Sequence, residues 1–154
     1  MPPLGPGHRY GCEQVLDAID AAYAAIEIVT SRFRSHEGAP RLDRLADNIS
    51  NAGLVISAPC RDWRSLALSA LPLRFTLEAG DGNAQVHEAH GGAPLNDPLL
   101  PLLWLANHLS ERGIGLHRGD IVTTGSWAGM PYLGRGGRAV VQFGGLGSVE
   151  LALA

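Results

Sequence analysis

The feature that most constrains the fold is a tight-turn signal between two short apolar runs. Residues 80–83 read Gly-Asp-Gly-Asn, and Asp-Gly tolerates the positive φ angles that a two-residue hairpin turn requires. We therefore predict a hairpin with strands over 73–79 and 84–89. Short apolar runs between other turn signals predict further strands at 25–29, 53–57, 121–124, 139–143 and 148–153.

Two segments have the three- and four-residue apolar spacing of helices. The first runs from Glu13 to Ile26, with acidic residues early, where they favour the helix dipole. The second follows Asp97 and Pro98, which can cap and begin a helix, and it ends at Gly113. Because this second helix is apolar nearly all round, we expect it to be deeply buried. Two main helices among many short strands favour an α+β fold with a mixed sheet or roll.

The size and composition of the chain predict one domain. A chain of 154 residues, 45% of them hydrophobic, can build one core but is short for two. We expect a flexible, proline- and glycine-rich tail or loop over 1–12 and a single domain over 13–154. No run reaches the roughly 18 apolar residues of a membrane span, and the first residues lack the pattern of a secretory signal. These features predict a cytoplasmic protein without a membrane partner.

The charged residues and the cysteines exclude further classes of protein. The net charge is −3, lysine is absent, and the arginines form no basic cluster, so nucleic acid is not an expected partner. Cys12 and Cys60 have no cysteine or histidine nearby at the spacing of metal ligands. We therefore expect two free thiols rather than a zinc site or a disulfide.

Glu27 is the most informative single residue, because it interrupts the apolar run 25–29, where burying an unpaired carboxylate would be costly. Three environments avoid that cost, and the residues alone leave all three open. Glu27 could pair with Arg32 or Arg34, point to water from an edge strand, or bind a hard divalent cation such as Mg²⁺. Short polar side chains are also dense at 47–51, where they either build a turn or line a site.

Two other motifs do not support a function. The residues of His87-Glu88-Ala89-His90 resemble a zinc-protease motif, but the histidine spacing is three, and on a strand the two rings face opposite ways. The glycine-rich stretch 134–137 opens a strand rather than a helix, so it lacks the helix N-terminus that binds phosphate. No Gly-x-Ser-x-Gly motif indicates acyl transfer.

Several segments together resemble the 2-keto-4-pentenoate hydratase and 4-oxalocrotonate decarboxylase family, within the wider fumarylacetoacetate hydrolase fold. The resemblance runs from about residue 13 to the last residues, with the segments in the family's order. Each segment is a weak signal alone, but their order and gaps are specific. The segments are Ala25-Ile26-Glu27-Ile28-Val29-Thr30-Ser31-Arg32, Ala46-Asp47-Asn48-Ile49-Ser50, Pro94-Leu95 with Trp104-Leu105-Ala106-Asn107, Gly119-Asp120-Ile121-Val122 with Thr124-Gly125-Ser126, and Gly145-Leu146-Gly147-Ser148-Val149.

The resemblance implies a lyase of aromatic catabolism that acts on a small 2-keto acid. It implies a Mg²⁺ or Mn²⁺ site of three carboxylates, of which Glu27 matches the last, and the metal would stabilise an enolate. Ser50 matches a catalytic hydroxyl of the pocket. Gly125 and Ser126 match the segment that closes over the substrate carboxylate. Without the resemblance, both serines read equally well as residues that form turns or end strands.

The sequence also departs from the family. The other two metal carboxylates stand in an upstream Glu-x-Glu strand, and a catalytic lysine also lies upstream, but this chain contains neither. One hypothesis is an enzyme whose missing groups come from another chain, from residues lost through a mis-assigned start, or from replacements elsewhere in the sequence. The other is a non-catalytic relative that binds a small acid or pairs with a related subunit. Both predict a homodimer or such pairing, and both predict weak or absent metal binding by the isolated chain.

Overall fold

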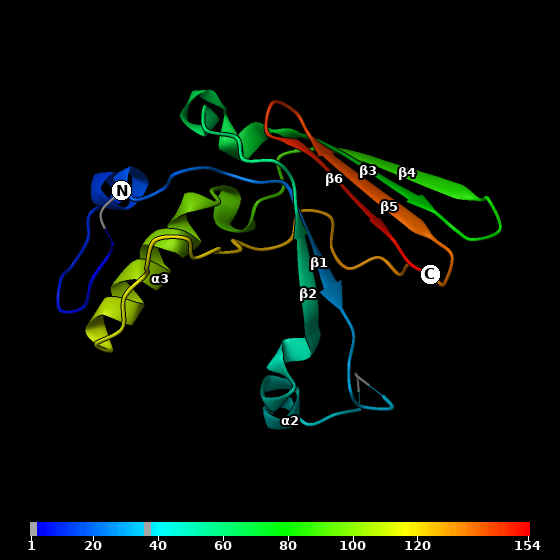
Figure 1. Cartoon of the computed structure of the whole chain (residues 1–154), viewed down its shortest axis with the longest axis horizontal. Coiled ribbons are helices and arrows are strands. Elements are labelled where there is room, and N and C mark those ends of the chain that lie inside the picture. The colour runs from blue at the N-terminus through cyan, green and yellow to red at the C-terminus, as the bar shows by residue number, and fades with distance from the viewer. Residues whose placement is uncertain (1–2, 36–37) are drawn as a thin grey trace.

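The computed structural model describes residues 3–35 and 38–154 (Figure 1). Met1 and Pro2, at the start of the expected tail, lie outside the described residues. Three α-helices and six strands form the described fold, together with four short 3₁₀ turns at Asn48–Ser50, Trp63–Ser65, Leu68–Ala70 and Pro94–Asn96. In chain order the main elements are α1 (Cys12–Asp17), β1 (Ala25–Val29), α2 (Arg41–Ala46), β2 (Asn51–Ile56), β3 (Pro72–Glu78), β4 (Ala84–His90), α3 (Leu99–Glu111), β5 (Arg138–Phe143) and β6 (Gly147–Ala152).

The strands form two antiparallel sheets. Four strands pair in the order β4-β3-β5-β6, and β1 pairs with β2 in a separate two-stranded ribbon. In Figure 1 the ribbon stands between the four-stranded sheet on one side and α3 on the other. The α+β class is confirmed, and the predicted hairpin joins β3 to β4 through residues 79–83.

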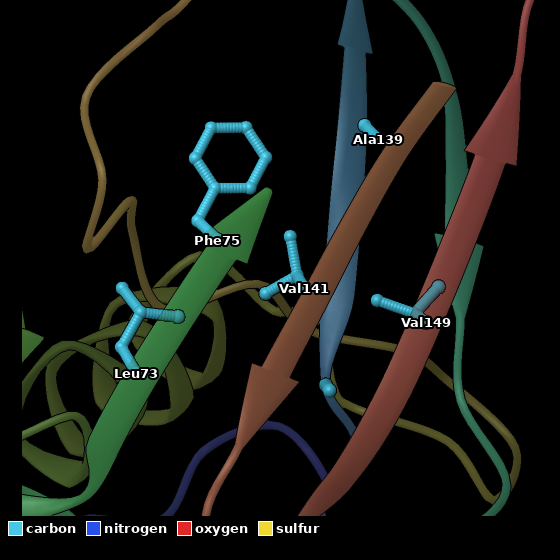
Figure 2. Packing of buried hydrophobic residues seen from close by; sticks show 6 residues of the cluster. Leu73, Phe75, Ala139, Val141 and Val149 are labelled. Atoms are coloured by element: carbon cyan, nitrogen blue, oxygen red, sulfur yellow. The ribbon is translucent and has the colours of Figure 1, made fainter. Parts of the chain in front are cut away.

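The main core lies on one face of the four-stranded sheet. Leu73, Phe75, Val141 and Val149 are at most 9% exposed, and they project from three neighbouring strands (Figure 2). The inner face of the ribbon and the segment 127–133 cover them, and Trp127 meets Phe143 edge to face with the ring centroids 5.2 Å apart. This packing removes apolar surface from water and fixes the ribbon against the sheet.

The predicted first helix is wrong beyond α1, which ends at Asp17. From there the chain extends, because the amide and carbonyl groups of Ala22 bond to those of Cys60 at 3.0 and 2.9 Å. Asp17 and Asp20 pair instead with Arg64 and Arg61, at 2.8 and 2.6 Å. Backbone and side-chain groups of this segment therefore take partners from residues 60–64 rather than from a continued helix.

The second helix is α3, and its predicted deep burial is wrong. One face packs on α1 and on Leu4, which is 6% exposed, so residues 3–11 are held as a loop against the domain. The opposite face carries Leu100 and Trp104, which are 46% and 63% exposed. The predicted strand over 121–124 is also wrong, since these residues join neither sheet. Within the described ranges, no helix combines the length and the apolar character needed to cross a bilayer.

Candidate functional site

The ribbon presents Glu27 on its open face, so of the three environments that the sequence left open, the structure shows a side chain that points to water from a strand. Side chains alternate along β1, and Ile26 faces the core while Glu27 is exposed. Glu27 lies opposite Leu54 on β2, and Val29, Leu54 and Ile56 on this face are all 36–39% exposed. The carboxylate is therefore surrounded by apolar side chains but open to water.

The partner of Glu27 is an amide. Asn51 Nδ2 donates a hydrogen bond of 2.7 Å to Glu27 Oε1. Neither Arg32 nor Arg34 pairs with Glu27, and no other cation of the described residues does so. A neutral donor binds one carboxylate oxygen and brings no positive charge to it, so the carboxylate stays open to a cation.

Asn51 follows a turn with unusual backbone geometry. Asn48, Ile49 and Ser50 have φ angles of 53°, 51° and 64°, which is the left-handed region that non-glycine residues rarely occupy. Such a run persists only where surrounding contacts determine it. Residues of this kind cluster at functional sites, which makes this turn a candidate on geometric grounds alone.

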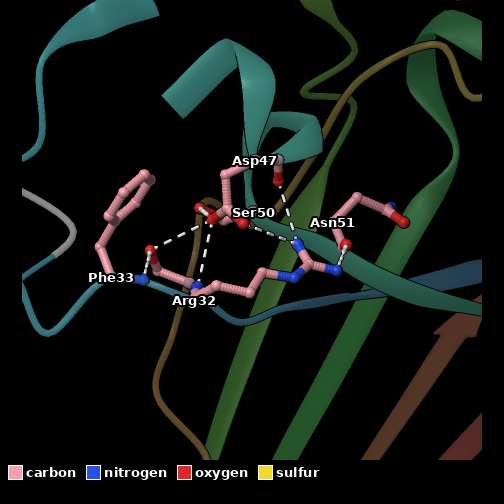
Figure 3. A network of polar contacts seen from close by, with 6 residues as sticks. Arg32, Phe33, Asp47, Ser50 and Asn51 are labelled. Carbon is pink, nitrogen blue, oxygen red and sulfur yellow. Dashed lines mark hydrogen bonds and ion pairs between the residues drawn. The ribbon is translucent and has the colours of Figure 1, made fainter. Parts of the chain in front are cut away.

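Arg32 and Asp47 supply those contacts (Figure 3). The Arg32 guanidinium donates to the carbonyl oxygens of Asp47 and Asn51, each at 3.0 Å, and so spans the two ends of the turn. The Asp47 carboxylate accepts bonds from the Arg32 amide at 3.2 Å and from the Ser31 hydroxyl at 3.3 Å, and it pairs with the guanidinium at 3.3 Å. We call these two residues the Arg32–Asp47 clamp.

The clamp changes the acidity of its carboxylate. The side chain of Asp47 is only 5% exposed, and this burial raises its pKa. The hydrogen bond from the Arg32 amide, the Arg32 charge and the Ser31 hydroxyl lower it more, so the pKa of Asp47 lies below its usual value. Asp47 is therefore ionised throughout the neutral range and holds Arg32 as a permanent counter-ion.

Ser50, the predicted catalytic hydroxyl, is fully buried inside the turn. Its hydroxyl donates to Asp47 Oδ2 at 3.4 Å, and its carbonyl oxygen accepts a 2.8 Å bond from the Thr30 amide. The structure thus places Ser50 beneath the clamp rather than on the open face with Glu27. Its catalytic role stays a prediction.

The two predicted substrate-binding residues share a cleft with Glu27. The cleft has a volume of about 1230 Å³, and its broad lining includes both faces of the ribbon, the core face of the four-stranded sheet and residues 117–133, among them Gly125 and Ser126. Gly125 has a φ of 108°, and the exposed Ser126 hydroxyl donates to the Gly129 carbonyl at 2.7 Å. The structure therefore brings Glu27, Gly125 and Ser126 to one cleft, and it leaves Ser50 outside the lining.

The donor set fits one ligand of a hard-cation site. A carboxylate oxygen is the donor that Mg²⁺ prefers, and Glu27 offers one on the cleft side of the ribbon. Across residues 3–35 and 38–154, no group of three or more histidine, cysteine, aspartate or glutamate side chains could hold a metal ion. These residues alone therefore do not complete such a site. Cys12 and Cys60 are free, as expected.

Comparison with known proteins decides the family. The family model described as fumarylacetoacetate (FAA) hydrolase C-terminal matches residues 5–154. The chain belongs to this family. The match covers the ribbon, the clamp and the cleft, so these features are parts of an FAA hydrolase C-terminal domain.

The similar proteins within this family are hydratases and decarboxylases. A 2-keto-4-pentenoate hydratase of Burkholderia vietnamiensis is 33% identical over 88% of the chain and 50% of its own length. A 4-oxalocrotonate decarboxylase of Pseudomonas putida is 30% identical over 97% and 54%. A solved 4-oxalocrotonate decarboxylase from Pseudomonas putida G7, complexed with magnesium and adipate, superposes with a TM-score of 0.78 at 27% identity, over 99% of the chain and 56% of its own. The chain thus spans about half the length of these relatives.

Sequence reasoning missed the role of Asn51. Its signal was present, because the polar density at 47–51 marked the turn, but that density did not distinguish the buried Ser50 from the neighbouring residue that reaches Glu27. Arg32 was considered as a partner of Glu27, and the structure gives it to Asp47 instead. Whether Arg32 pairs with Glu27 or with Asp47 depends on the backbone path of the left-handed turn. The composition of the segment does not encode this path.

Proposed function

We propose that this FAA hydrolase C-terminal chain carries part of a hydratase- or decarboxylase-like site for a small 2-keto acid or its 2-hydroxy-dienoate form. The observation that carries the proposal is the meeting of Glu27, Gly125 and Ser126 in one cleft. The relatives named above support the same chemistry. A cytoplasmic role in aromatic catabolism is the setting that this proposal implies.

Each residue has a distinct part in this proposal. Glu27 would be one ligand of a Mg²⁺ or Mn²⁺ ion, which when bound supplies Lewis-acid stabilisation to an enolate. Gly125 and Ser126, which line the same cleft, would border the substrate carboxylate. The apolar side chains around Glu27 would accommodate the hydrocarbon part of the acid and limit the water around it.

The proton transfer has no assigned residue within the described cleft. The chain contains no lysine, and Ser50 is buried under the clamp. We therefore assign this chain the binding and orientation of the acid rather than the proton transfer. The further carboxylates and the base would come from outside the described residues.

The test combines binding and turnover. The chain is mixed with Mg²⁺ and 2-hydroxypenta-2,4-dienoate, and the loss of dienol absorbance and the binding of the acid are followed. We expect binding that depends on Mg²⁺ and is lost in Glu27→Gln, with Asp81→Asn in the β3–β4 turn as the control carboxylate. Binding or turnover that survives Glu27→Gln would remove the metal role assigned to Glu27.

A non-catalytic binding or pairing module is the second candidate. It is favoured by the missing three-carboxylate group among the described residues and by the exposed apolar face around Glu27. Its partner would be a second copy of the chain or a related subunit. Binding of the acid without turnover favours this candidate, and turnover that depends on Glu27 favours the enzyme. Sedimentation of the chain alone and with a full-length relative tests the pairing.

A further inference from the structure

We propose that Asn51 is the positioning residue of Glu27, and that the Arg32–Asp47 clamp both fixes Asn51 and keeps the Arg32 charge away from Glu27. The importance of this arrangement for ligand binding rests on the proposed function. The arrangement itself does not, because it concerns contacts within the chain that can be measured without metal or substrate.

Asn51 lies where the pairing of the ribbon becomes irregular. The pairing of β1 with β2 shifts between Ile28 and Val29, so that Val29 lies opposite Asn51. This irregularity brings the Asn51 side chain within 2.7 Å of Glu27 Oε1. The second oxygen, Oε2, accepts no hydrogen bond from the residues that the structure describes. Asn51 therefore fixes one oxygen and leaves the other for a ligand.

Arg32 and Asp47 hold Asn51 in place. Its backbone leaves a turn of three left-handed residues, and its carbonyl oxygen accepts a bond from Arg32 Nη2. The other end of the turn is held by Arg32 Nη1 and by the buried Asp47 carboxylate. A single planar guanidinium thus bridges both ends of the turn, which a lysine ammonium at the same position could not do with the same geometry.

The clamp also determines which carboxylate receives the Arg32 charge. Arg32 lies five positions after Glu27 and is the nearest arginine along the chain, so it is the natural counter-ion for that carboxylate. Asp47 binds it instead, and Glu27 receives a neutral amide. A carboxylate paired with arginine is still ionised, but the guanidinium compensates its charge, whereas an amide partner leaves the carboxylate open to a cation. By binding Arg32, the clamp leaves the Glu27 carboxylate without an arginine partner.

The test observes the Asn51 side-chain amide by NMR in the metal-free chain. A hydrogen bond to a carboxylate separates the two amide proton shifts. Glu27→Gln replaces the carboxylate by a neutral and weaker acceptor, so it is expected to move the Asn51 amide protons toward the shifts of a solvated asparagine, and Asp47→Asn is expected to do the same. The matched control is Asp81→Asn, which makes the same change from a carboxylate to an amide at a residue that accepts a 2.8 Å bond from Asn83 in the β3–β4 turn. This control should leave the Asn51 signals unchanged.

Unchanged Asn51 signals in Glu27→Gln and Asp47→Asn, with the far-UV circular dichroism retained, would overturn the proposal. If Asp47→Asn does not fold, Arg32→Lys replaces it, because lysine keeps the charge but cannot bridge both carbonyl oxygens. The expected result for Arg32→Lys is the same movement of the Asn51 amide protons. An unchanged Asn51 amide in that variant counts against the clamp.

A second measurement separates this proposal from the proposed function. Mn²⁺ is added alone, and its paramagnetic broadening of the Glu27 and Asn51 signals is followed. We expect Asn51→Ala to weaken this broadening about 10-fold or more, and Asn51→Gln, which keeps the amide donor, to restore part of it. Broadening that is equal in Asn51→Ala and in the unchanged chain would contradict positioning by Asn51.

The two failures are distinguishable. If Mn²⁺ broadens no signal near Glu27 while the Asn51 amide responds to Glu27→Gln, the metal proposal fails and the positioning stands. If Mn²⁺ broadens the Glu27 signals while the Asn51 amide responds to neither Glu27→Gln nor Asp47→Asn, the positioning fails and the metal proposal stands.

Discussion

The four-stranded sheet and the β1–β2 ribbon are stabilised by different interactions. The sheet buries Leu73, Phe75, Val141 and Val149 on one face, and its strands pair in a regular register. The ribbon has one open face, and its end is held by a left-handed turn with the Arg32–Asp47 clamp. Apolar packing therefore stabilises the scaffold, and polar contacts shape the region that carries Glu27.

This contrast explains where the candidate site lies. A close-packed sheet has little room for a charged side chain, whereas an open ribbon can present one beside a cleft. The cost is an irregular backbone that specific side chains must hold. If this is so, substitutions in the sheet and in the ribbon should disturb different kinds of interaction.

The largest effect is expected in the sheet. Leu73→Ala removes a side chain that is 2% exposed and should lower the free energy of unfolding by about 2–5 kcal/mol, because it leaves a cavity. Leu54→Ala on the open face of the ribbon, where the leucine is 36% exposed, should lower it by less than half as much. Urea unfolding of both variants provides the measurement. Equal losses would contradict the division between the two regions.

An intermediate effect is expected at the clamp, and it depends on pH. Because the folded pKa of Asp47 is lowered, its ionised form stabilises the fold above the ordinary aspartate pKa, and this stabilisation is lost as the pH falls through the lowered value. The unchanged chain should therefore be more stable than Asp47→Asn at neutral pH. The two stabilities should converge in acid. Unfolding curves recorded across this range would contradict the prediction if they stayed parallel.

A smaller effect of opposite sign is expected within the turn. Ile49 is 68% exposed and has a φ of 51°, which is costly for a β-branched residue. Ile49→Gly should raise the free energy of unfolding by up to about 1 kcal/mol, since glycine adopts this conformation without steric cost. The control is Ile114→Gly, at a 51% exposed isoleucine without a positive φ, which should destabilise the chain. Thermal melting provides the measurement. A destabilised Ile49→Gly variant or a stabilised Ile114→Gly variant would contradict the prediction.

The smallest effect is expected for an ion pair on the surface of the sheet. Arg74 pairs with Glu88 at 3.2 Å, and the two side chains are 54% and 65% exposed. Arg74→Ala should lower the free energy of unfolding by less than about 1 kcal/mol, because water screens this pair. A larger loss in chemical unfolding would mean that polar contacts also support the sheet.

The sheet was largely predictable from the sequence, because its signals are local. The Asp-Gly turn at 81–82 and the short apolar runs around it predicted β3 and β4, and the runs at 139–143 and 148–153 predicted β5 and β6. Glu27 was also correctly placed on a strand. These features depend on neighbouring residues and on strand alternation, both of which the sequence carries directly.

The ribbon and helices were less predictable, because their structure depends on distant partners. The helix expected from Glu13 ends at Asp17, since Ala22 pairs with Cys60. Glu27 points to water because only one face of its ribbon is covered, and the sequence could not choose this environment over the two alternatives. The left-handed turn that separates Ser50 from Asn51 has no glycine to mark it. Local pattern cannot report which surface a later segment will cover.

The central claim is that Glu27 is a carboxylate that this chain offers to a divalent cation from the cleft. Calorimetric titration of Mg²⁺ into the chain, beside Glu27→Gln and Asp81→Asn, tests it most directly. A lone carboxylate predicts binding no tighter than millimolar, abolished by Glu27→Gln and retained in Asp81→Asn. Submicromolar binding, or binding unaffected by Glu27→Gln, would contradict the account.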